Sequence, residues 1–363
     1  MKTKVKLKDI ASYSKGSQIN GDKLIENGMY EYLNGGINPS GKWDDYNTPG
    51  GTVTISEGGN SCGYVNFMEN PFWCGAHCYY LYDTVQNVRY LYYALKSQQD
   101  RLMKIRSGAC MPNIKKADLG EFDLFFDTDK VEQQGAVDVL QRAERIIADR
   151  QYELHVLEDL KKARFVEMFG DPVSNEKGWP TRPLLSMGSC KNGMNFHYDD
   201  SGVKLNCLGV GDFKDYSIIA DTATLPMVSL NEIPSSEYLL QDDDIVFVRS
   251  NGNKKMVGRS VAVYPGSVPT TFSGFCIRFR RNDDSVITPY LLRVLKAESM
   301  RQKMYGRGAN IQNLNQQTLS SLDIPVPPKT LQEEFAAFII QVDKSKLPEE
   351  YAILNLRLLY SWH

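Results

Sequence analysis

The sequence predicts an α+β protein in which two related β-rich domains stand in tandem, each followed by a long α-helix. Three observations predict this fold class. Residues 90–126 align with residues 290–326 without a gap. Residues 128–170, between the two copies, carry both signs of charge at helical spacing, and residues 328–363 show a similar character after the second copy. A repeat of domain size indicates duplication, and the change from strand-rich to helical segments places the chain in the α+β class.

The duplication is defined by ten identities in the gap-free alignment. The identical pairs are Tyr90/Tyr290, Leu91/Leu291, Leu95/Leu295, Lys96/Lys296, Arg101/Arg301, Gly108/Gly308, Ala109/Ala309, Asn113/Asn313, Leu119/Leu319 and Asp123/Asp323. Weaker matches keep the same order upstream: residues 5–16 with 182–193, 52–60 with 245–253, and 75–82 with 273–280. One such match arises by chance, but four in the same order indicate that a whole domain was copied.

Each copy reads as short alternating strands punctuated by Gly, Asn and Pro, with one helix near its end. We expect these helices at Val88–Ile105 and Pro289–Tyr305, and closing strands at Phe122–Phe126 and Leu322–Val326. The expected boundaries are residues 1–127 for the first domain, 128–170 for the central helix, 171–327 for the second domain and 328–363 for the distal helix.

The central helix is predicted by its capping signal and its heptad spacing. Asp129 and Glu132 form a capping-box pattern. Apolar residues at a spacing of seven give the segment a seam suited to a coiled coil. Thr330 and Glu333 repeat the capping pattern before the distal helix. The residues expected to pair the helices are Leu140, Ile147, Leu154 and Leu157 in the first segment, and Leu331, Phe335, Phe338 and Val342 in the second.

Composition excludes several classes of function. The net charge is −2, so any DNA contact has to come from local patches or from a partner. Seven scattered cysteines are typical of reduced thiols in a cytosol. No apolar run is long enough to cross a bilayer, and the basic N-terminus lacks an apolar segment behind it. We therefore expect a cytoplasmic protein that does not contact a membrane.

The catalytic motifs in the chain are incomplete. Residues 36–43 nearly match a phosphate-binding loop, but Trp43 stands where a Ser or Thr would bind Mg²⁺, so a polar hairpin is the better interpretation. Cys62, Cys74, His77 and Cys78 lack the second ligand pair of a recognised zinc motif, and buried thiols explain them better. We expect no metal site and no catalytic residue.

Residues 249–259 carry the strongest binding signal, because four cations and several amides occur there without an acid. Arg and Lys bind phosphates or guanine edges, and Asn and Gln bind adenine edges. Residues 301–313 and 101–113 each add three cations near the end of a helix. A solvated helix C-terminus explains those cations about equally well, since the helix dipole favours positive charge there.

The order of domains and helices resembles the specificity subunit of type I restriction-modification systems. The supporting strings are RFVEMFGDP at residues 164–172, KGW at 177–179 and LDIPVPPKTLQEEF at 322–335. The resemblance implies that each domain is a target-recognition domain for one half of a bipartite DNA sequence. It also implies that the two helices pair as an antiparallel coiled coil that sets the gap between the halves.

The family further implies the partners of such a chain. Two modification (methyltransferase) subunits and a restriction subunit would dock on it, and S-adenosylmethionine, ATP and Mg²⁺ would bind to those partners. The chain itself would not be catalytic. One feature departs from the family pattern, because Pro348 should kink or break the distal helix and shorten it.

Given this resemblance, we expect residues in the polar turns to contact double-stranded DNA. These residues are Arg249, Asn251, Asn253, Lys254, Lys255 and Arg259, with Arg307, Asn310 and Gln312, and in the first domain Asn60, Arg106 and Asn113. Two alternatives remain open from the residues alone. One is a tandem carbohydrate- or protein-binding module that uses the 20 Tyr and 15 Phe, and the other is a metal-dependent nuclease around Asp242–Asp244 and Lys254.

Overall fold

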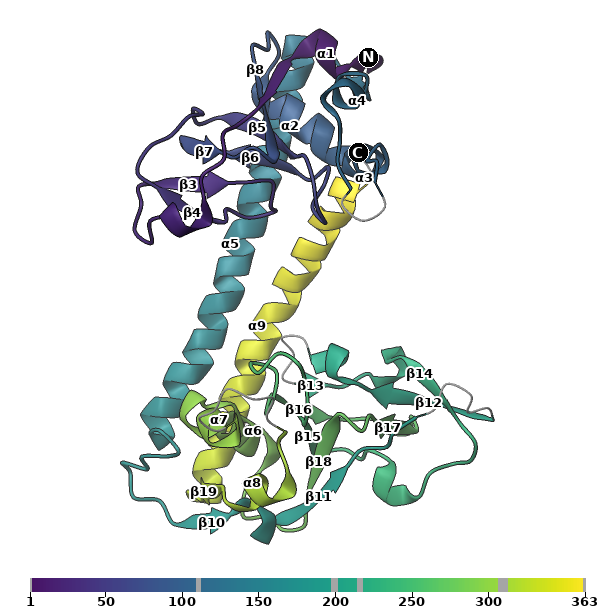
Figure 1. The fold of residues 1–363 in the computed structure, drawn as a ribbon. Coiled ribbons are helices and arrows are strands. Elements are labelled where there is room, and N and C mark those ends of the chain that lie inside the picture. The colour runs from purple at the N-terminus through teal and green to yellow at the C-terminus, as the bar shows by residue number, and fades with distance from the viewer. Residues whose placement is uncertain (1, 109–111, 197–201, 214–217, 306–312, 362–363) are drawn as a thin grey trace. The chain divides into compact units, whose positions relative to one another are not determined.

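The computed structural model describes residues 2–108, 112–196, 202–213, 218–305 and 313–361, with side chains in the last helix as far as Ser345. The chain separates into two compact units (Figure 1). Unit 1 comprises residues 1–152 and 349–363, and unit 2 comprises residues 153–348. Both long helices contribute residues to both units. None of the described helices has the length and apolar character needed to cross a membrane.

Unit 1 is built from a four-stranded sheet, a three-stranded sheet and a two-stranded clasp in its described residues. The strand orders are β2-β8-β5-β6, β4-β3-β7 and β1-β9. The strands are β1 (Thr3–Lys6), β2 (Ser12–Lys15), β3 (Tyr30–Leu33), β4 (Gly41–Trp43), β5 (Thr52–Ser56), β6 (Val65–Met68), β7 (Phe72–Cys74), β8 (Cys78–Tyr82) and β9 (Asp123–Phe126). The short helices are α1 (Leu7–Ile10), η1 (Gly21–Lys23) and α4 (Lys116–Gly120).

Unit 2 repeats this plan around a five-stranded sheet. The strand orders are β11-β18-β15-β16-β13, β14-β12-β17 and β10-β19. The strands are β10 (Thr181–Pro183), β11 (Gly188–Asn192), β12 (Val203–Leu208), β13 (Ile218–Ile219), β14 (Met227–Leu230), β15 (Asp244–Val248), β16 (Ser260–Val263), β17 (Thr270–Phe272), β18 (Cys276–Arg281) and β19 (Asp323–Pro325). The short helices are η2 (Leu184–Ser186), η3 (Val210–Phe213), η4 (Thr222–Thr224), η5 (Ser236–Tyr238) and α8 (Gln316–Ser320).

Every strand pairing described in unit 1 recurs in unit 2, which adds β13 parallel to β16, and this confirms the α+β class and the tandem repeat. In each unit the first strand pairs antiparallel with the closing strand, β1 with β9 and β10 with β19. The central strand of the main sheet lies antiparallel to both neighbours, as β8 does between β2 and β5, and β18 between β11 and β15. The predicted polar hairpin at residues 36–43 is confirmed, because β3 and β4 pair antiparallel there.

The duplicated residues of the gap-free alignment pack the core of each unit. Leu91, Leu95 and Leu119 are fully buried in unit 1, as are Leu291, Leu295 and Leu319 in unit 2. Burying one leucine side chain stabilises the fold by about 2 kcal/mol. These positions keep their identity in both copies because each fills the same place against a sheet.

The helix predicted in each copy is two helices. Unit 1 has α2 (Val88–Ser97) and α3 (Gln99–Lys104), and unit 2 has α6 (Thr288–Lys296) and α7 (Glu298–Tyr305). The break in unit 1 falls at Gln98. Its side-chain Nε2 donates to the Ala94 carbonyl at 3.1 Å, and its Oε1 accepts from the backbone amide of Phe125 at 3.2 Å. The prediction of one continuous helix was wrong in both copies, because the backbone leaves the helical conformation at Gln98 in unit 1 and at Ala297 in unit 2.

The long helices are α5 (Lys130–Phe169) and α9 (Lys329–Ser361), which Figure 1 draws in teal and yellow. Asp129 caps α5 by accepting from the Val131 amide at 2.9 Å, but the Asp129 amide bonds to Asp127 instead of Glu132, so only half of the capping box forms. Helix α9 begins before Thr330. It also continues through Pro348, which removes one backbone donor but does not end the helix.

Within unit 2, the end of α5 and the start of α9 lie antiparallel. Phe335 lies 5.5 Å, between ring centroids, from both Phe165 and Phe169. Lys161 pairs with Asp343, and Arg164 pairs with Glu334 at 2.8 Å, so residue numbers fall along α9 as they rise along α5.

The residues predicted to pair the helices divide into several environments. Phe335 and Val342 are buried, Leu331 packs on the core of unit 2, and Phe338 lies under the Arg164 guanidinium. Leu140 packs on the core of unit 1, and Ile147, Leu154 and Leu157 are half-buried. The aromatic contacts of Phe165 and Phe169 were missed by the sequence argument, which followed a seven-residue spacing that ends at Leu154.

Candidate nucleic-acid interface

The turn that follows β15 holds the six cations and amides predicted in unit 2. We call residues 249–259 the β15 turn. Asn251 accepts from the Asn253 amide at 2.8 Å, and Asn253 accepts from the Lys255 amide at 3.0 Å. Gly258 adopts φ of 76°, a backbone conformation that side chains disfavour. The two asparagines therefore shape the turn before they contact any ligand.

The β15 turn is fixed to the rest of unit 2 by two arginines. Arg301 of α7 donates to the Lys255 carbonyl at 2.8 Å and to the Val257 carbonyl at 3.0 Å. Arg249 donates to the Gly274 carbonyl at 3.2 Å. Asn253, Lys254 and Lys255 are exposed, whereas Arg249, Asn251 and Arg259 are half-buried. These hydrogen bonds thus fix the turn on the surface of unit 2, where Lys254 and Lys255 are exposed to solvent. The sequence predicted Arg301 only as a cation near the end of a helix. It did not predict the hydrogen bonds from Arg301 to the β15 turn.

The three residues predicted in unit 1 come together around the turn after β5. We call residues 57–60 the β5 turn. Gly59 donates to the Pro112 carbonyl at 3.0 Å, and Ser107 and Asn113 exchange two backbone hydrogen bonds of 2.8 Å. Asn60, Arg106 and Asn113 are exposed. The structure therefore brings the β5 turn beside Pro112 and Asn113, and Asn113 beside Ser107. Arg307, Asn310 and Gln312 lie outside the described residues.

Hydrogen bonds show which positions of the two turns correspond. Glu57 donates its amide to the carbonyl of His77 at 2.9 Å and accepts from the Ile114 amide at 2.9 Å. Arg249 makes the same two bonds, to the Phe275 carbonyl at 2.8 Å and from the Leu314 amide at 2.9 Å. Glu57 and Arg249 therefore occupy one position of the repeated fold, and His77 and Phe275 occupy another.

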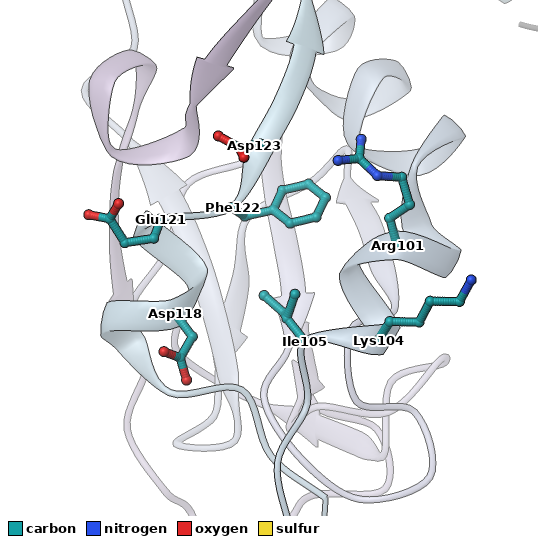
Figure 2. A pocket seen from close by; sticks show the side chains of 7 residues that line it. All are labelled: Arg101, Lys104, Ile105, Asp118, Glu121, Phe122 and Asp123. Atoms are coloured by element: carbon teal, nitrogen blue, oxygen red, sulfur yellow. The ribbon is translucent and has the colours of Figure 1, made fainter.

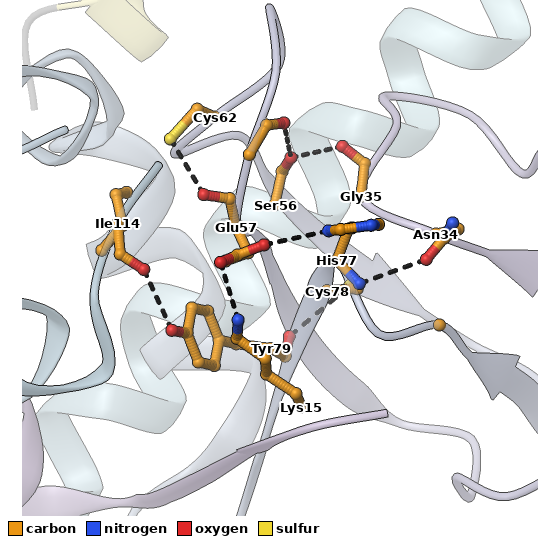
Figure 3. Close-up of polar contacts among 12 residues, drawn as sticks. Lys15, Asn34, Gly35, Ser56, Glu57, Cys62, His77, Cys78, Tyr79 and Ile114 are labelled. Carbon is orange, nitrogen blue, oxygen red and sulfur yellow. Dashed lines mark hydrogen bonds and ion pairs between the residues drawn. The ribbon is translucent and has the colours of Figure 1, made fainter. Parts of the chain in front are cut away.

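Glu57 lies at the centre of a polar cluster that the sequence analysis did not single out (Figure 3). One carboxylate oxygen accepts from Lys15 at 2.6 Å and the other lies 3.1 Å from His77 Nδ1. Burial raises the pKa of Glu57, but hydrogen bonds from Lys15 and His77 outweigh it and leave the pKa below its ordinary value. The carboxylate is therefore ionised at neutral pH and accepts hydrogen bonds only. In the sequence it directly precedes Gly58 and Gly59, within one of the repeated segments.

A hollow of 650 Å³ in unit 1 carries both signs of charge (Figure 2). Arg101 and Lys104 line it opposite Asp118, Glu121 and Asp123. Glu121 already pairs with Lys6 and Lys8. The Arg101 guanidinium lies 5.5 Å from the centre of the Phe122 ring. The hollow thus carries both signs of charge, and it does not favour a ligand of one charge.

The aspartates of the nuclease alternative each serve a structural hydrogen bond. Asp244 is buried and accepts from Arg280 at 2.8 and 2.7 Å. Asp242 accepts from the Gly266 amide and Asp243 from the Tyr264 hydroxyl.

The cysteines considered as zinc ligands are buried. The Cys62 thiol donates to the Glu57 carbonyl at 3.1 Å, and Cys74 and Cys78 lie beside one another in the core. Among the described residues, no group of three His, Cys, Asp or Glu side chains is placed to hold a metal ion.

Comparisons with known proteins point to one family. A family model described as "Type I restriction modification DNA specificity domain" matches residues 2–155 and 213–355. A Mycoplasma genitalium protein named as a type I specificity subunit is 36% identical over 141 residues, which are 38% of this chain and 37% of that protein. The specificity subunit of the type I restriction enzyme EcoKI of Escherichia coli K12 is 28% identical over 186 residues, 47% of this chain and 38% of that protein.

The match with each of these relatives spans less than two fifths of its length. Solved structures extend the likeness in fold to nearly the whole chain. The crystal structure of a type I restriction-modification S subunit from M. genitalium has a TM-score of 0.62 at 20% identity and covers 99% of this chain and 94% of that one. A structure from work on the assembly of a type I system has a TM-score of 0.53 at 13% identity. These matches give no support to a carbohydrate- or protein-binding module.

Proposed function

This chain belongs to the type I restriction modification DNA specificity family, and we propose that it reads a bipartite sequence in double-stranded DNA. Each unit would read one half. The observation that carries the proposal is the pair of matching turns, in which the same backbone bonds hold Glu57 in one unit and Arg249 in the other. A repeated frame that carries different side chains suits two target halves of different sequence.

The contacts in unit 2 would combine phosphate binding with base reading. Exposed Lys254 and Lys255 suit the phosphate backbone, which supplies affinity without sequence information. Arg249 sits deeper in the turn, where the Gly274 carbonyl fixes its guanidinium. A fixed planar fork suits a guanine edge. In unit 1, Asn60, Arg106 and Asn113 lie together and would form the corresponding surface.

The chemistry of modification and cleavage would belong to partner subunits. We propose that two modification subunits and a restriction subunit assemble on this chain in the cytoplasm, and that they bind S-adenosylmethionine, ATP and Mg²⁺. The chain would contribute recognition and no catalytic group. Helices α5 and α9 would set the gap between the half-sites, as their antiparallel contacts in unit 2 suggest.

The salt dependence of DNA binding tests the proposed interface. The full chain, purified with its modification subunit, is bound to a duplex that carries its methylated target. The double substitution Lys254→Gln and Lys255→Gln should lower the slope of log affinity against log salt by up to about 2, since each lost phosphate contact removes about 0.9. Lys204→Gln, an exposed position on β12, is the matched control and should leave the slope unchanged. An unchanged slope in the double variant would contradict the interface.

A further inference from the structure

The turns that precede β8 and β18 each present an aromatic ring at the same position of the fold. His77 and Phe275 each supply the carbonyl that accepts the amide of the first residue after β5 or β15, which is Glu57 or Arg249. The next residues, Cys78 and Cys276, occupy matching places in the main sheets, opposite Ser56 and Val248. The correspondence therefore rests on backbone hydrogen bonds and sheet register, which do not depend on the side chains.

Both rings are exposed beside the surfaces proposed to bind DNA. The side chain of His77 is 63% exposed, and Phe275 is 61% exposed. A single exposed apolar side chain is ordinary. Here, however, an exposed ring recurs at the same position in both copies, and each adjoins a turn with DNA-binding chemistry. The Phe275 carbonyl bonds to Arg249, and the Gly274 carbonyl binds the Arg249 guanidinium.

Side-chain hydrogen bonds and close packing hold the two aromatic turns in place. The His77 amide donates to Asn34 Oδ1 at 3.1 Å, and the Phe275 amide donates to Ser273 Oγ at 3.3 Å. The residue two before His77 is Gly75, where an added Cβ would lie 2.2 Å from Asn34 Oδ1. At Gly274 an added Cβ would lie 2.1 Å from Asn195 Oδ1. A rigid turn presents its ring without a large loss of conformational entropy on binding.

The two rings offer different chemistry to a base. Phe275 has no polar atom in its side chain, and in the major groove an apolar side chain distinguishes thymine by its C5-methyl group. His77 has Nδ1 engaged by the carboxylate of Glu57, so Nδ1 carries the proton and Nε2 is the ring nitrogen that remains. Lys15, on the far side of Glu57, helps to hold that carboxylate in place.

We propose that this position discriminates bases in both units: Phe275 contacts the methyl group of a thymine in one half-site, and His77 hydrogen-bonds through Nε2 to a base edge in the other. The inference rests on the proposed function and deepens it. Glu57 and Lys15 act as positioning residues for His77.

Removal of single thymine methyl groups tests Phe275. The full chain with its modification subunit is bound to duplexes in which each thymine of the target is replaced in turn by deoxyuridine. One replacement should weaken wild-type binding about 3- to 10-fold, in keeping with the energy of a single base contact. Phe275→Ala should bind the thymine and uracil duplexes equally, and Phe275→Leu should keep part of the preference. Ile233→Ala, at another exposed apolar position, should discriminate like the wild type.

Methylation maps test His77 and separate this inference from the proposed function. His77→Ala should relax one base in a single half-site, and Phe275→Ala should relax one base in the other. If the chain directs methylation to no bipartite sequence, the proposed function fails. If it directs a bipartite sequence but no uracil substitution weakens binding, or both alanine variants keep the wild-type sequence, only this inference fails.

Discussion

The two units carry side chains of opposite charge at a position where their backbones make the same hydrogen bonds. The first residue after β5 or β15 makes the same two backbone hydrogen bonds in both units, yet it is Glu57 in unit 1 and Arg249 in unit 2. Around it, Lys15 and His77 in unit 1 are replaced by Asn192 and Phe275 in unit 2. The comparison teaches that the duplicated fold supplies a constant backbone frame, in which an acidic side chain in unit 1 is replaced by a basic one in unit 2.

Reversal of the charge at Arg249 should have the largest effect on this comparison. Arg249→Glu removes the guanidinium and places a carboxylate near DNA phosphates, so affinity for the target duplex should fall about 100-fold, or roughly 3 kcal/mol. Lys204→Glu changes charge by the same amount on β12 and should cost far less. Fluorescence anisotropy at fixed salt measures both. Equal losses for the two variants would mean that Arg249 acts only through net charge.

The buried glutamine at the start of each long helix should matter equally in both units. Gln133 accepts from the Asn87 amide at 2.9 Å, and Gln332 accepts from the Ile287 amide at the same distance. Both side chains are fully buried and both also donate to carbonyls. Gln133→Leu and Gln332→Leu should each destabilise their unit by about 2 kcal/mol, because buried partners lose their hydrogen bonds. Hydrogen exchange of peptides in each unit measures this, and a tolerated substitution in one unit would break the equivalence.

Replacement of the repeated lysine of the α2 and α6 helices should have different effects in the two units. Lys96 donates to the Val65 carbonyl at 2.9 Å and lies 3.7 Å from the centre of the Tyr64 ring, so Lys96→Met should destabilise unit 1 by about 1 kcal/mol. Burial lowers the pKa of Lys296 to about 8. Lys296→Met should therefore cost unit 2 less at pH 7 than Lys96→Met costs unit 1.

The pH dependence of the Lys296 variant follows from the direction of its pKa shift. A depressed lysine pKa penalises folding while the amine is charged in both states, and the penalty fades between pH 8 and the ordinary value of 10.5. The stability gap between Lys296→Met and the wild type should thus shift in favour of the wild type over that range in thermal unfolding. A gap that stays constant up to pH 10.5 would contradict the assigned cause.

The smallest expected effect is the stabilisation of unit 1 by the ionised Glu57 carboxylate, which acid should remove. Because its pKa in the folded chain lies below the ordinary 4.5, its contribution is present above that pH and is lost as pH falls through the folded pKa. Glu57→Gln should be less stable than the wild type at pH 7, and the difference should shrink below about pH 4.5. Hydrogen exchange in unit 1 at pH 7 and pH 4 measures it. Unit 2 has Arg249 at this position, so its exchange should not respond to the substitution.

The duplication was visible in the sequence because steric constraints keep the same residue at some positions of both copies. An added Cβ at Gly16 would lie 1.9 Å from the Cys74 carbonyl oxygen, and at Gly193 it would lie 2.1 Å from that of Ser273. Those two glycines fall in one of the matches that revealed the repeat. The buried leucines of the gap-free alignment are also the same in both copies, because each packs in the core of its unit. The fold class and the order of elements were therefore predictable.

Much of the candidate site was not predictable, because it depends on register and on partners distant in sequence. The alignment of residues 52–60 with 245–253 pairs Glu57 with Ser250, whereas the sheet register pairs Glu57 with Arg249. Without the sheet register, the replacement of Glu57 in unit 1 by Arg249 in unit 2 was not visible in the sequence. The cluster of Lys15, Glu57 and His77 likewise joins three separate strand ends. The β15 turn was visible because its cations and amides are contiguous in sequence.

The central claim is that each unit reads its own half of a bipartite target, and an exchange of one unit's recognition domain tests it most directly. Residues 180–325 are replaced by the corresponding segment of a family member with a different target, and methylated adenines are mapped across the genome of a host that carries the chain with its modification subunit. The account predicts a gapped methylated sequence in which one half changes while the other half and the gap stay the same. A contiguous methylated sequence, or one in which both halves persist after the exchange, would contradict it.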